Sequence, residues 1–232
     1  MEGQPPLVVV TDKQWKASDK KRETWAKGDL AANEWKDAME VAPLGGGPWG
    51  ELYKSTTGAP NAPLYLRKQI TLKADVQRAR LYATALGLYD FFIDGQAVTQ
   101  DVLKPDWDDY HVRVQYQTFD VTKLLQKGDN ALGAILACGW YCGHVGLTPG
   151  HVYGARPALL AQLHVEYSDG STETFITDKS WRWGAGPIES SDLLDGESYD
   201  ARKEMPGWDK VGFDDSQWQR VSIRDSSAKL QA

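Results

Sequence analysis

In the stretch DLLDGESYDAR, residues 192–202, three carboxylates, Asp195, Glu197 and Asp200, lie within six positions beside Arg202. A Glu and an Asp that flank a glycosidic bond at about 5–10 Å separation can act as general acid and general base. Alternatively, the arginine pairs with one carboxylate while the loop packs against a neighbouring domain. We expect this structural role. The residues of this inter-domain loop are Asp195, Glu197, Asp200 and Arg202. The alternative is a self-contained carbohydrate-active enzyme that uses Glu197 and Asp200 as its acid and base.

A second candidate site is the glycine-rich stretch CGWYCGHVGLTPGHVYG, residues 138–154, which follows a strand-like segment. We expect it to form a long loop at one end of a β-sandwich, where binding groups are commonly displayed. Aromatic faces pack against the C–H faces of sugar rings, while the indole N–H stays available as a donor. The loop therefore predicts a carbohydrate contact through Trp140, Tyr141, His144 and His151; the alternative is a loop folded onto its own core.

The stretch KPDWDDY, residues 104–110, offers a third site. Asp106, Asp108 and Asp109 could supply oxygen ligands to calcium, a possible cofactor, with Trp107 as a sugar platform. Adjacent side chains diverge, however, and the twelve-residue EF-hand pattern is missing. We expect an Asp-rich turn with a packed tryptophan. The four histidines are scattered, and the two that share a loop have no third ligand in view, so the sequence predicts no zinc site.

Composition limits the classes of protein that the chain can represent. A net charge of −6 argues against a nucleic-acid or anionic-membrane partner, and no apolar run approaches the length of a bilayer span. Cys138 and Cys142 are the only cysteines. We expect two small, mostly buried thiols. The alternative is a local disulfide, which requires an oxidising compartment. Secretion or a periplasmic location is a hypothesis, although Met1 is not followed by a leader-like segment.

Strand patterns that must position these residues dominate from residue 64 onward. In ALLAQLHVEY, residues 158–167, apolar side chains alternate with polar ones, and Asp-Gly turns follow this stretch and YDFFI, residues 89–93. The segment HVRVQYQTFDVT, residues 111–122, places Val112, Val114 and Tyr116 inward and then slips phase, which indicates a bulge or a strand that changes sheets. TKLLQKGDN predicts one helical turn closed by Gly128. The pattern predicts an all-β fold, an antiparallel β-sandwich or jelly roll.

The chain also contains an internal repeat. TDKQW at residues 11–15 returns as TDKSW at 177–181, and each copy is followed by two tryptophans ten positions apart. The second copy closes the large β-domain, 61–232, so residues 1–60 predict the C-terminal strands of a preceding β-domain plus a linker. Strands added to the main sandwich are the alternative. We expect the tryptophans of the repeat to plug sandwich edges: Trp15, Trp35, Trp181 and Trp218.

From Tyr65 onward the sequence resembles the N-terminal β-sandwich domain of bacterial α-L-rhamnosidases of glycoside hydrolase family 78. The most specific segments are GWY-x-G, DGE-x-YDAR and FDDS-x-W, which begin at residues 139, 195 and 213. The resemblance implies a galactose-binding-domain-like sandwich. Related calcium-dependent rhamnose-binding modules carry an Asp-Asn pair where this chain has Leu86-Gly87, which weakens an inherited calcium and rhamnose site.

In this family an inverting two-carboxylate mechanism is housed in a separate helical (α/α)₆ barrel. The resemblance therefore implies that the catalytic acid and base lie outside this chain. We expect a non-catalytic accessory module that either supports and orients the barrel or holds a rhamnose-containing glycan. A stand-alone, lectin-like L-rhamnose-binding module is the further alternative.

Overall fold

The computed structural model describes residues 14–18, 35–39, 61–148, 150–224 and 229–231. The chain divides into two compact units, residues 1–55 and 56–232. The first contains strands β1 (Lys16–Ala17) and β2 (Lys36–Asp37). The second contains β3 (Leu64–Leu72), β4 (Val76–Leu86), β5 (Leu88–Ile93), β6 (Gln96–Ala97), β7 (Arg113–Gln115), β8 (Gln117–Asp120), η4 (Thr122–Leu124), β9 (Gly128–Ala137), α1 (Gly139–Cys142), β10 (Ala158–Tyr167), β11 (Thr172–Ile176), β12 (Arg182–Gly184), β13 (Ile188–Asp192), β14 (Gly196–Tyr199), η5 (Ala201–Lys203), β15 (Gln219–Arg220) and β16 (Lys229–Gln231).

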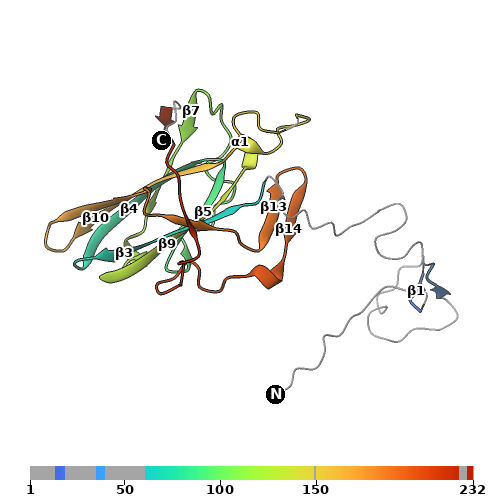
Figure 1. The fold of residues 1–232 in the computed structure, drawn as a ribbon, viewed down its shortest axis with the longest axis horizontal. Helices are drawn as coiled ribbons and strands as arrows, with labels where there is room; N and C mark the ends of the chain where they lie inside the picture. Colours follow the sequence, from blue (N-terminus) through green and yellow to red (C-terminus); the bar gives the residue numbers. More distant parts are fainter. Residues whose placement is uncertain (1–13, 19–34, 40–60, 149, 225–228, 232) are drawn as a thin grey trace, which may run out of the picture. The chain divides into compact units, whose positions relative to one another are not determined.

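The second unit is an antiparallel β-sandwich, which confirms the predicted fold class (Figure 1). One sheet has the strand order β11-β10-β4-β8, and the facing sheet has the order β15-β12-β3-β9-β5-β6. Strands β13 and β14 pair as a hairpin outside both sheets, and β16 pairs in parallel with β7. In the part of the chain that the structure describes, no helix is long and apolar enough to cross a membrane.

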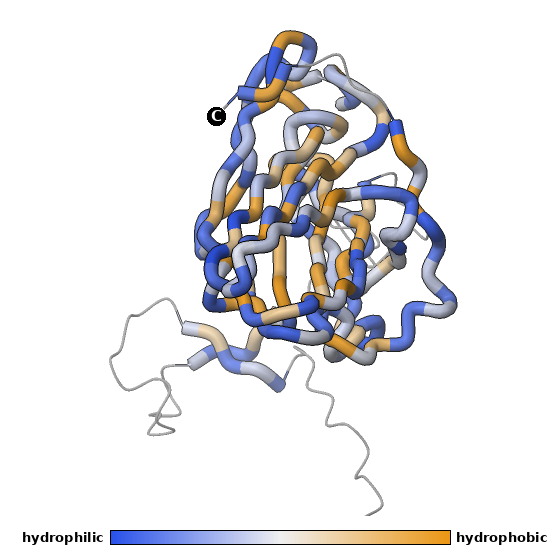
Figure 2. Tube along the Cα trace, turned by 90° about the vertical axis from the view of Figure 1, so that its left-hand side faces the viewer, coloured by the Kyte–Doolittle hydropathy of each residue, from blue (hydrophilic) through white to orange (hydrophobic). Residues whose placement is uncertain are grey.

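Alternating side chains build the core between the two sheets. Figure 2 shows polar and apolar segments alternating along the strands. On β10, Ala161, Leu163, Val165 and Tyr167 point into the core, as predicted from the period of two. At the first Asp-Gly turn, Asp94 and Gly95 both have positive φ angles, 47° and 81°, which fits the tight hairpin between β5 and β6. The aliphatic and aromatic alternation thus fixes which face of each strand is buried.

The predicted change of phase near residue 116 is a change of pairing partner. Strand β7 pairs with β16, whereas β8, which starts two residues after β7 ends, pairs with β4. Val114 and Val121 are buried, but Val112 is exposed, so its predicted inward position was wrong. Val112 precedes β7 and lies in a turn, where its backbone N–H donates to the carbonyl of Asp109. The alternation of buried and exposed side chains along a strand therefore does not apply to Val112.

The internal repeat has the same strand register in both copies. In the second copy, Arg182 pairs with Arg220 and Trp183 with Gln219. In the first copy, Lys16 pairs with Asp37 and Ala17 with Lys36, at equivalent distances from Trp15 and Trp35.

A backbone hydrogen bond repeats as well. The N–H of Ala38 donates to the carbonyl of Trp15 at 2.8 Å, and the N–H of Val221 donates to that of Trp181 at 3.2 Å. Ala38 and Val221 each stand three residues after the last tryptophan of their copy. The repeated letters therefore encode a repeated pair of antiparallel strands. In the second copy, the β13–β14 hairpin lies between the TDK-x-W segment and the last two tryptophans.

Candidate functional site

An aromatic cluster connects two of the predicted sites. The indoles of Trp107 and Trp140 stack with ring centroids 6.2 Å apart and an angle of 17° between their planes. Trp107 Nε1 donates to the Tyr153 hydroxyl at 3.3 Å, and Tyr153 packs edge-on against Tyr110 at 5.1 Å. The sequence segments 104–110 and 138–154, predicted as separate sites, thus meet in space. We call Trp107, Trp140 and Tyr153 the aromatic cluster.

This cluster presents a partly open apolar surface with polar edges. The side chain of Trp107 is 50% exposed, and the ring of His111 lies 5.3 Å from that of Tyr153. Tyr110 is buried beneath the cluster, and burial raises the pKa of its hydroxyl. An exposed indole that carries a neighbouring hydroxyl and imidazole can stack on a sugar ring and hydrogen-bond to its hydroxyls.

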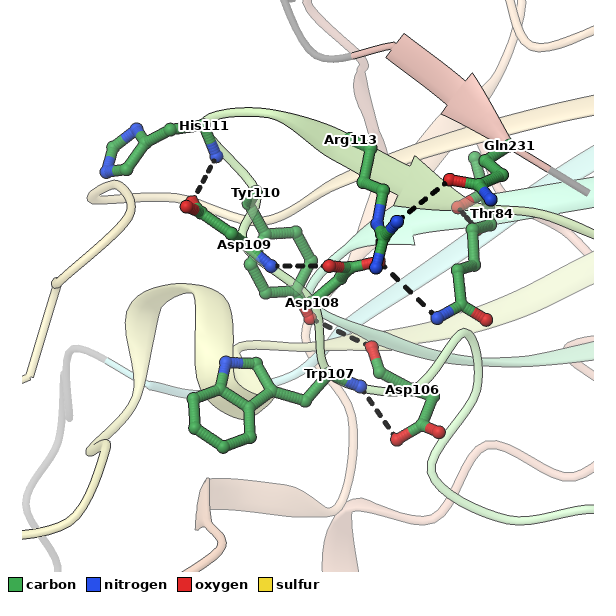
Figure 3. A network of polar contacts seen from close by, with 10 residues as sticks. Thr84, Asp106, Trp107, Asp108, Asp109, Tyr110, His111, Arg113 and Gln231 are labelled. Atoms are coloured by element: carbon green, nitrogen blue, oxygen red, sulfur yellow. Dashed lines mark hydrogen bonds and ion pairs between the residues drawn. The ribbon is translucent and has the colours of Figure 1, made fainter.

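The three aspartates next to Trp107 are engaged separately (Figure 3). Asp106 Oδ1 accepts from the N–H of Trp107 at 2.7 Å, and Asp109 Oδ1 accepts from the N–H of His111 at 3.0 Å. Asp108 Oδ2 accepts from Arg113 Nε at 2.6 Å, and this hydrogen bond holds the pKa of Asp108 below its usual value. Their carboxylates diverge as expected for an Asp-rich turn, and calcium at this turn stays a prediction.

The position expected for the calcium-binding pair offers no side-chain oxygen. Leu86 is buried, and Gly87 has a φ angle of 126°. A Cβ on Gly87 would lie 2.3 Å from the carbonyl oxygen of Ala137, so the backbone at this corner requires glycine.

The two cysteines form a disulfide, so the expectation of free thiols was wrong. Cys138 and Cys142 flank the single turn of α1, which brings their Cα atoms to 4.7 Å. This separation lies in the range that a disulfide spans. The bond closes the start of the 138–154 loop directly beside the aromatic cluster.

Tyr141 supports that loop from inside. Its ring is 6% exposed, and its hydroxyl accepts from Arg224 Nη2 at 2.6 Å. The guanidinium also lies over the ring, 5.5 Å from its centroid. Tyr141 therefore packs in the core of the loop, whereas Trp140 of the same turn faces Trp107.

The two loop histidines lie in different surroundings. His144 Nδ1 lies 3.3 Å from Asp192 Oδ2 and 3.3 Å from Asp195 Oδ2. His151 is exposed and has a φ angle of 59°. His144 thus joins the loop to the β13–β14 hairpin, a contact that sequence spacing did not reveal because its partners lie about fifty residues further on.

The hairpin stretch carries the expected arginine pair. Arg202 Nε and Nη2 donate to the two oxygens of Asp200, each at 2.8 Å. This bidentate hydrogen bond lowers the pKa of Asp200 to about 2. Asp200 therefore stays ionised near neutral pH, where a general acid must carry a proton. Glu197 lies exposed on β14. Arg202 therefore pairs with one carboxylate of this stretch, the arrangement that the structural interpretation expects.

Residues 74–232 match the family described as the alpha-L-rhamnosidase N-terminal domain. An alpha-L-rhamnosidase of Streptomyces avermitilis is 46% identical over 225 residues, which are 96% of this chain and 22% of that protein. A crystal structure of the S. avermitilis enzyme complexed with L-rhamnose has a TM-score of 0.72 at 47% identity, over 94% of this chain and 21% of that one. A structure of native rhamnosidase from Aspergillus terreus has a TM-score of 0.67 at 42% identity, over 70% of this chain and 20% of that one.

Fold and site together define a β-sandwich module with aromatic loops at one end. The chain belongs to the alpha-L-rhamnosidase N-terminal domain family. It spans about one fifth of the length of the relatives that it matches, 22% of the S. avermitilis protein and 20% of the A. terreus structure. It therefore corresponds to an accessory β-domain of these multidomain proteins.

Proposed function

We propose that this module holds rhamnose-containing glycans through its aromatic cluster, as part of a longer α-L-rhamnosidase. The observation that carries the proposal is the stacked pair of Trp107 and Trp140, contributed by two loops, with Trp107 half exposed. The N–H of Trp107 and the hydroxyl of Tyr153 already bond to each other, so the ring orientation is set before a ligand arrives. A preset aromatic surface loses little conformational freedom on binding.

Calorimetry with L-rhamnose and with a rhamnose-terminated oligosaccharide, each with and without calcium, tests this function. We expect saturable binding that Trp107→Ala weakens about tenfold or more, because a central aromatic anchor contributes about 1.4 kcal/mol or more. Trp15→Ala is the matched control, since Trp15 is another partly exposed tryptophan in the other unit. No heat at millimolar sugar, or equal loss in both variants, would contradict sugar binding at this cluster.

A second function, support of a catalytic domain, is favoured by the β13–β14 hairpin. The hairpin stands outside both sheets and exposes Leu194 and Tyr199, and η5, which follows it, exposes Arg202. Such a mixture of apolar and charged side chains is typical of inter-domain surfaces. The proposed partner is the helical-barrel domain of the parent polypeptide. Hydrogen exchange of the chain fused to that domain, with and without the substitution Leu194→Ser, tests the contact. The fusion should protect the hairpin amides from exchange, and Leu194→Ser should remove this protection.

We also propose that hydrolysis takes place outside this chain. Asp200 is tied to Arg202, and Glu197 lies on an exposed strand, so neither carboxylate has the enclosed setting in which enzymes raise the pKa of a general acid. Hydrolysis of a nitrophenyl rhamnoside by the chain, abolished by Glu197→Gln, would instead establish a self-contained enzyme.

The matching register of the two repeat copies supports a domain boundary within the chain. We propose that residues 1–60 contribute the last strands of a preceding β-domain and a linker, and that 61–232 form the rhamnosidase-type sandwich. The amide spectrum of a 61–232 fragment should superimpose on that of the whole chain. Collapse of that spectrum would favour strands that belong to the main sandwich.

A further inference from the structure

A buried ring nitrogen without a hydrogen bond stands out where the 138–154 loop meets the β13–β14 hairpin. His144 Nδ1 has no hydrogen-bond partner, although it is shielded from solvent. Leaving a buried polar atom unsatisfied is costly, and proteins rarely do so without a reason such as an ion. One carboxylate oxygen of Asp192 and one of Asp195 each lie 3.3 Å from this nitrogen.

The distances from His144 Nδ1 to the two carboxylate oxygens match the spacing of metal ligands. A zinc ion holds nitrogen and oxygen ligands at about 2.0–2.1 Å, which places two tetrahedral ligand atoms about 3.3 Å apart. Both distances from His144 Nδ1 equal this value, and the three ligand atoms lie within 4.8 Å of one another. Among the residues that the structure describes, His144, Asp192 and Asp195 form the group of His, Cys, Asp and Glu side chains whose ligand atoms come this close together.

The surrounding backbone fixes the central carboxylate. Asp192 Oδ1 accepts from the N–H of Leu194 at 2.9 Å, and Oδ2 accepts from the N–H of His144 at 2.9 Å. A Cβ on Gly143 would lie 2.6 Å from Asp192 Oδ2, so glycine there permits the close approach. These backbone donors therefore fix the Asp192 carboxylate beside His144 before any ion binds.

We propose that His144, Asp192 and Asp195 bind one zinc ion, which fastens the 138–154 loop to the β13–β14 hairpin. One imidazole and two carboxylates suit a borderline cation such as zinc, whereas calcium prefers six or more oxygen ligands. The Asp195 side chain is 70% exposed, so water completes the coordination from the solvent side. The zinc site is independent of sugar binding at the aromatic cluster.

Zinc titration of the EDTA-treated, dialysed 232-residue chain tests the site. We expect one ion per chain with a Kd near or below about 10 μM, at least about tenfold weaker in His144→Gln and in Asp195→Asn, because even outer-shell partners of a metal contribute 10–100-fold. His164→Gln is the matched control. His164 Nε2 lies 4.0 Å from Glu166 Oε1, so it is another partly exposed histidine side chain beside a carboxylate.

Two further readouts make the result decisive. Zinc at a hundredfold excess over Kd should raise the melting temperature by about 5–10 °C in the parent chain and in His164→Gln, but not in His144→Gln. Cobalt should give the visible absorption of a low-coordinate site in the same two proteins. The proposal is overturned by an absence of saturable zinc binding, by affinity unchanged in both ligand variants, or by a preference for calcium.

Discussion

The guanidinium of Arg67 forms a buried ion pair with the carboxylate of Asp215, which ties strand β3 to the loop that leads into β15. Arg67 is 2% exposed and also donates to three carbonyl oxygens of that loop, those of Trp208, Lys210 and Phe213. A single side chain therefore satisfies the backbone of a segment that has few strand partners.

Replacement of Arg67 should destabilise the sandwich strongly. Arg67→Ala removes the donor to three carbonyls and leaves Asp215 with Arg182 Nε, 3.4 Å from its Oδ1, as its remaining partner, and we expect the free energy of unfolding to fall by about 3–5 kcal/mol. Arg202→Ala, which removes an exposed arginine from a bidentate pair, should lower it far less, because solvent screens an exposed ion pair. Urea unfolding measures both. Equal, small losses would show that the buried clamp contributes no more than a surface pair.

Trp181 is the plug of the sandwich that the repeat predicts. It is 2% exposed, packs edge-on against Phe91 at 6.2 Å and donates from Nε1 to the carbonyl of Ile176 at 3.1 Å. Trp181→Ala should reduce the free energy of unfolding by about 3–5 kcal/mol, because it leaves a cavity and an unmatched acceptor. Trp107→Ala, at a half-exposed position, should cost much less in the same urea experiment; the reverse order would contradict the assigned roles.

Asp200 should titrate well below the usual value of an aspartate. Its pKa is lowered to about 2 by Arg202, so the stabilising effect of the pair is complete above the unfolded value near 4 and disappears as the pH falls towards 2. Carboxyl-carbon NMR should report a midpoint near 2 in the parent chain and a midpoint closer to 3.8 in Arg202→Ala. An unchanged midpoint in the variant would mean that Arg202 does not hold the carboxylate.

The disulfide can be tested by alkylation. The unfolded, unreduced chain should take up no iodoacetamide, whereas prior reduction should expose two reactive thiols, Cys138 and Cys142. Mass spectrometry counts the adducts. Two adducts before reduction, in protein purified from an oxidising compartment, would restore the expectation of free thiols.

Local pattern predicted most of the strands, because alternation and Asp-Gly turns act over a few residues. The alternating stretch at 158–167 became β10, and the phase slip near Tyr116 became an exchange of partner strands. Val112 was misplaced because the alternation was extended into the turn before β7. The disulfide was misjudged because two cysteines at a sequence separation of 4 can be either free buried thiols or a bonded pair that closes one helical turn.

The long-range contacts could not be predicted from spacing. The ion pair of Arg67 and Asp215 joins residues 148 positions apart, and the stacking of Trp107 on Trp140 depends on two loops that meet only in the folded sandwich. Each partner was visible as a charged or aromatic residue in a marked motif, but no local rule connects them. Sequence spacing offered no reason to connect His144 with a metal, because the two carboxylates beside it, Asp192 and Asp195, come from the hairpin about fifty residues further along the chain.

The most direct test of glycan binding by this module is an NMR titration of its tryptophan indole signals with a rhamnose-terminated oligosaccharide. The stacked pair predicts saturable shifts of the Trp107 and Trp140 N–H signals, with the buried Trp181 signal unchanged. If these two signals stay fixed at saturating sugar, or if the shifts map instead to the β13–β14 hairpin, the aromatic cluster is not the glycan site.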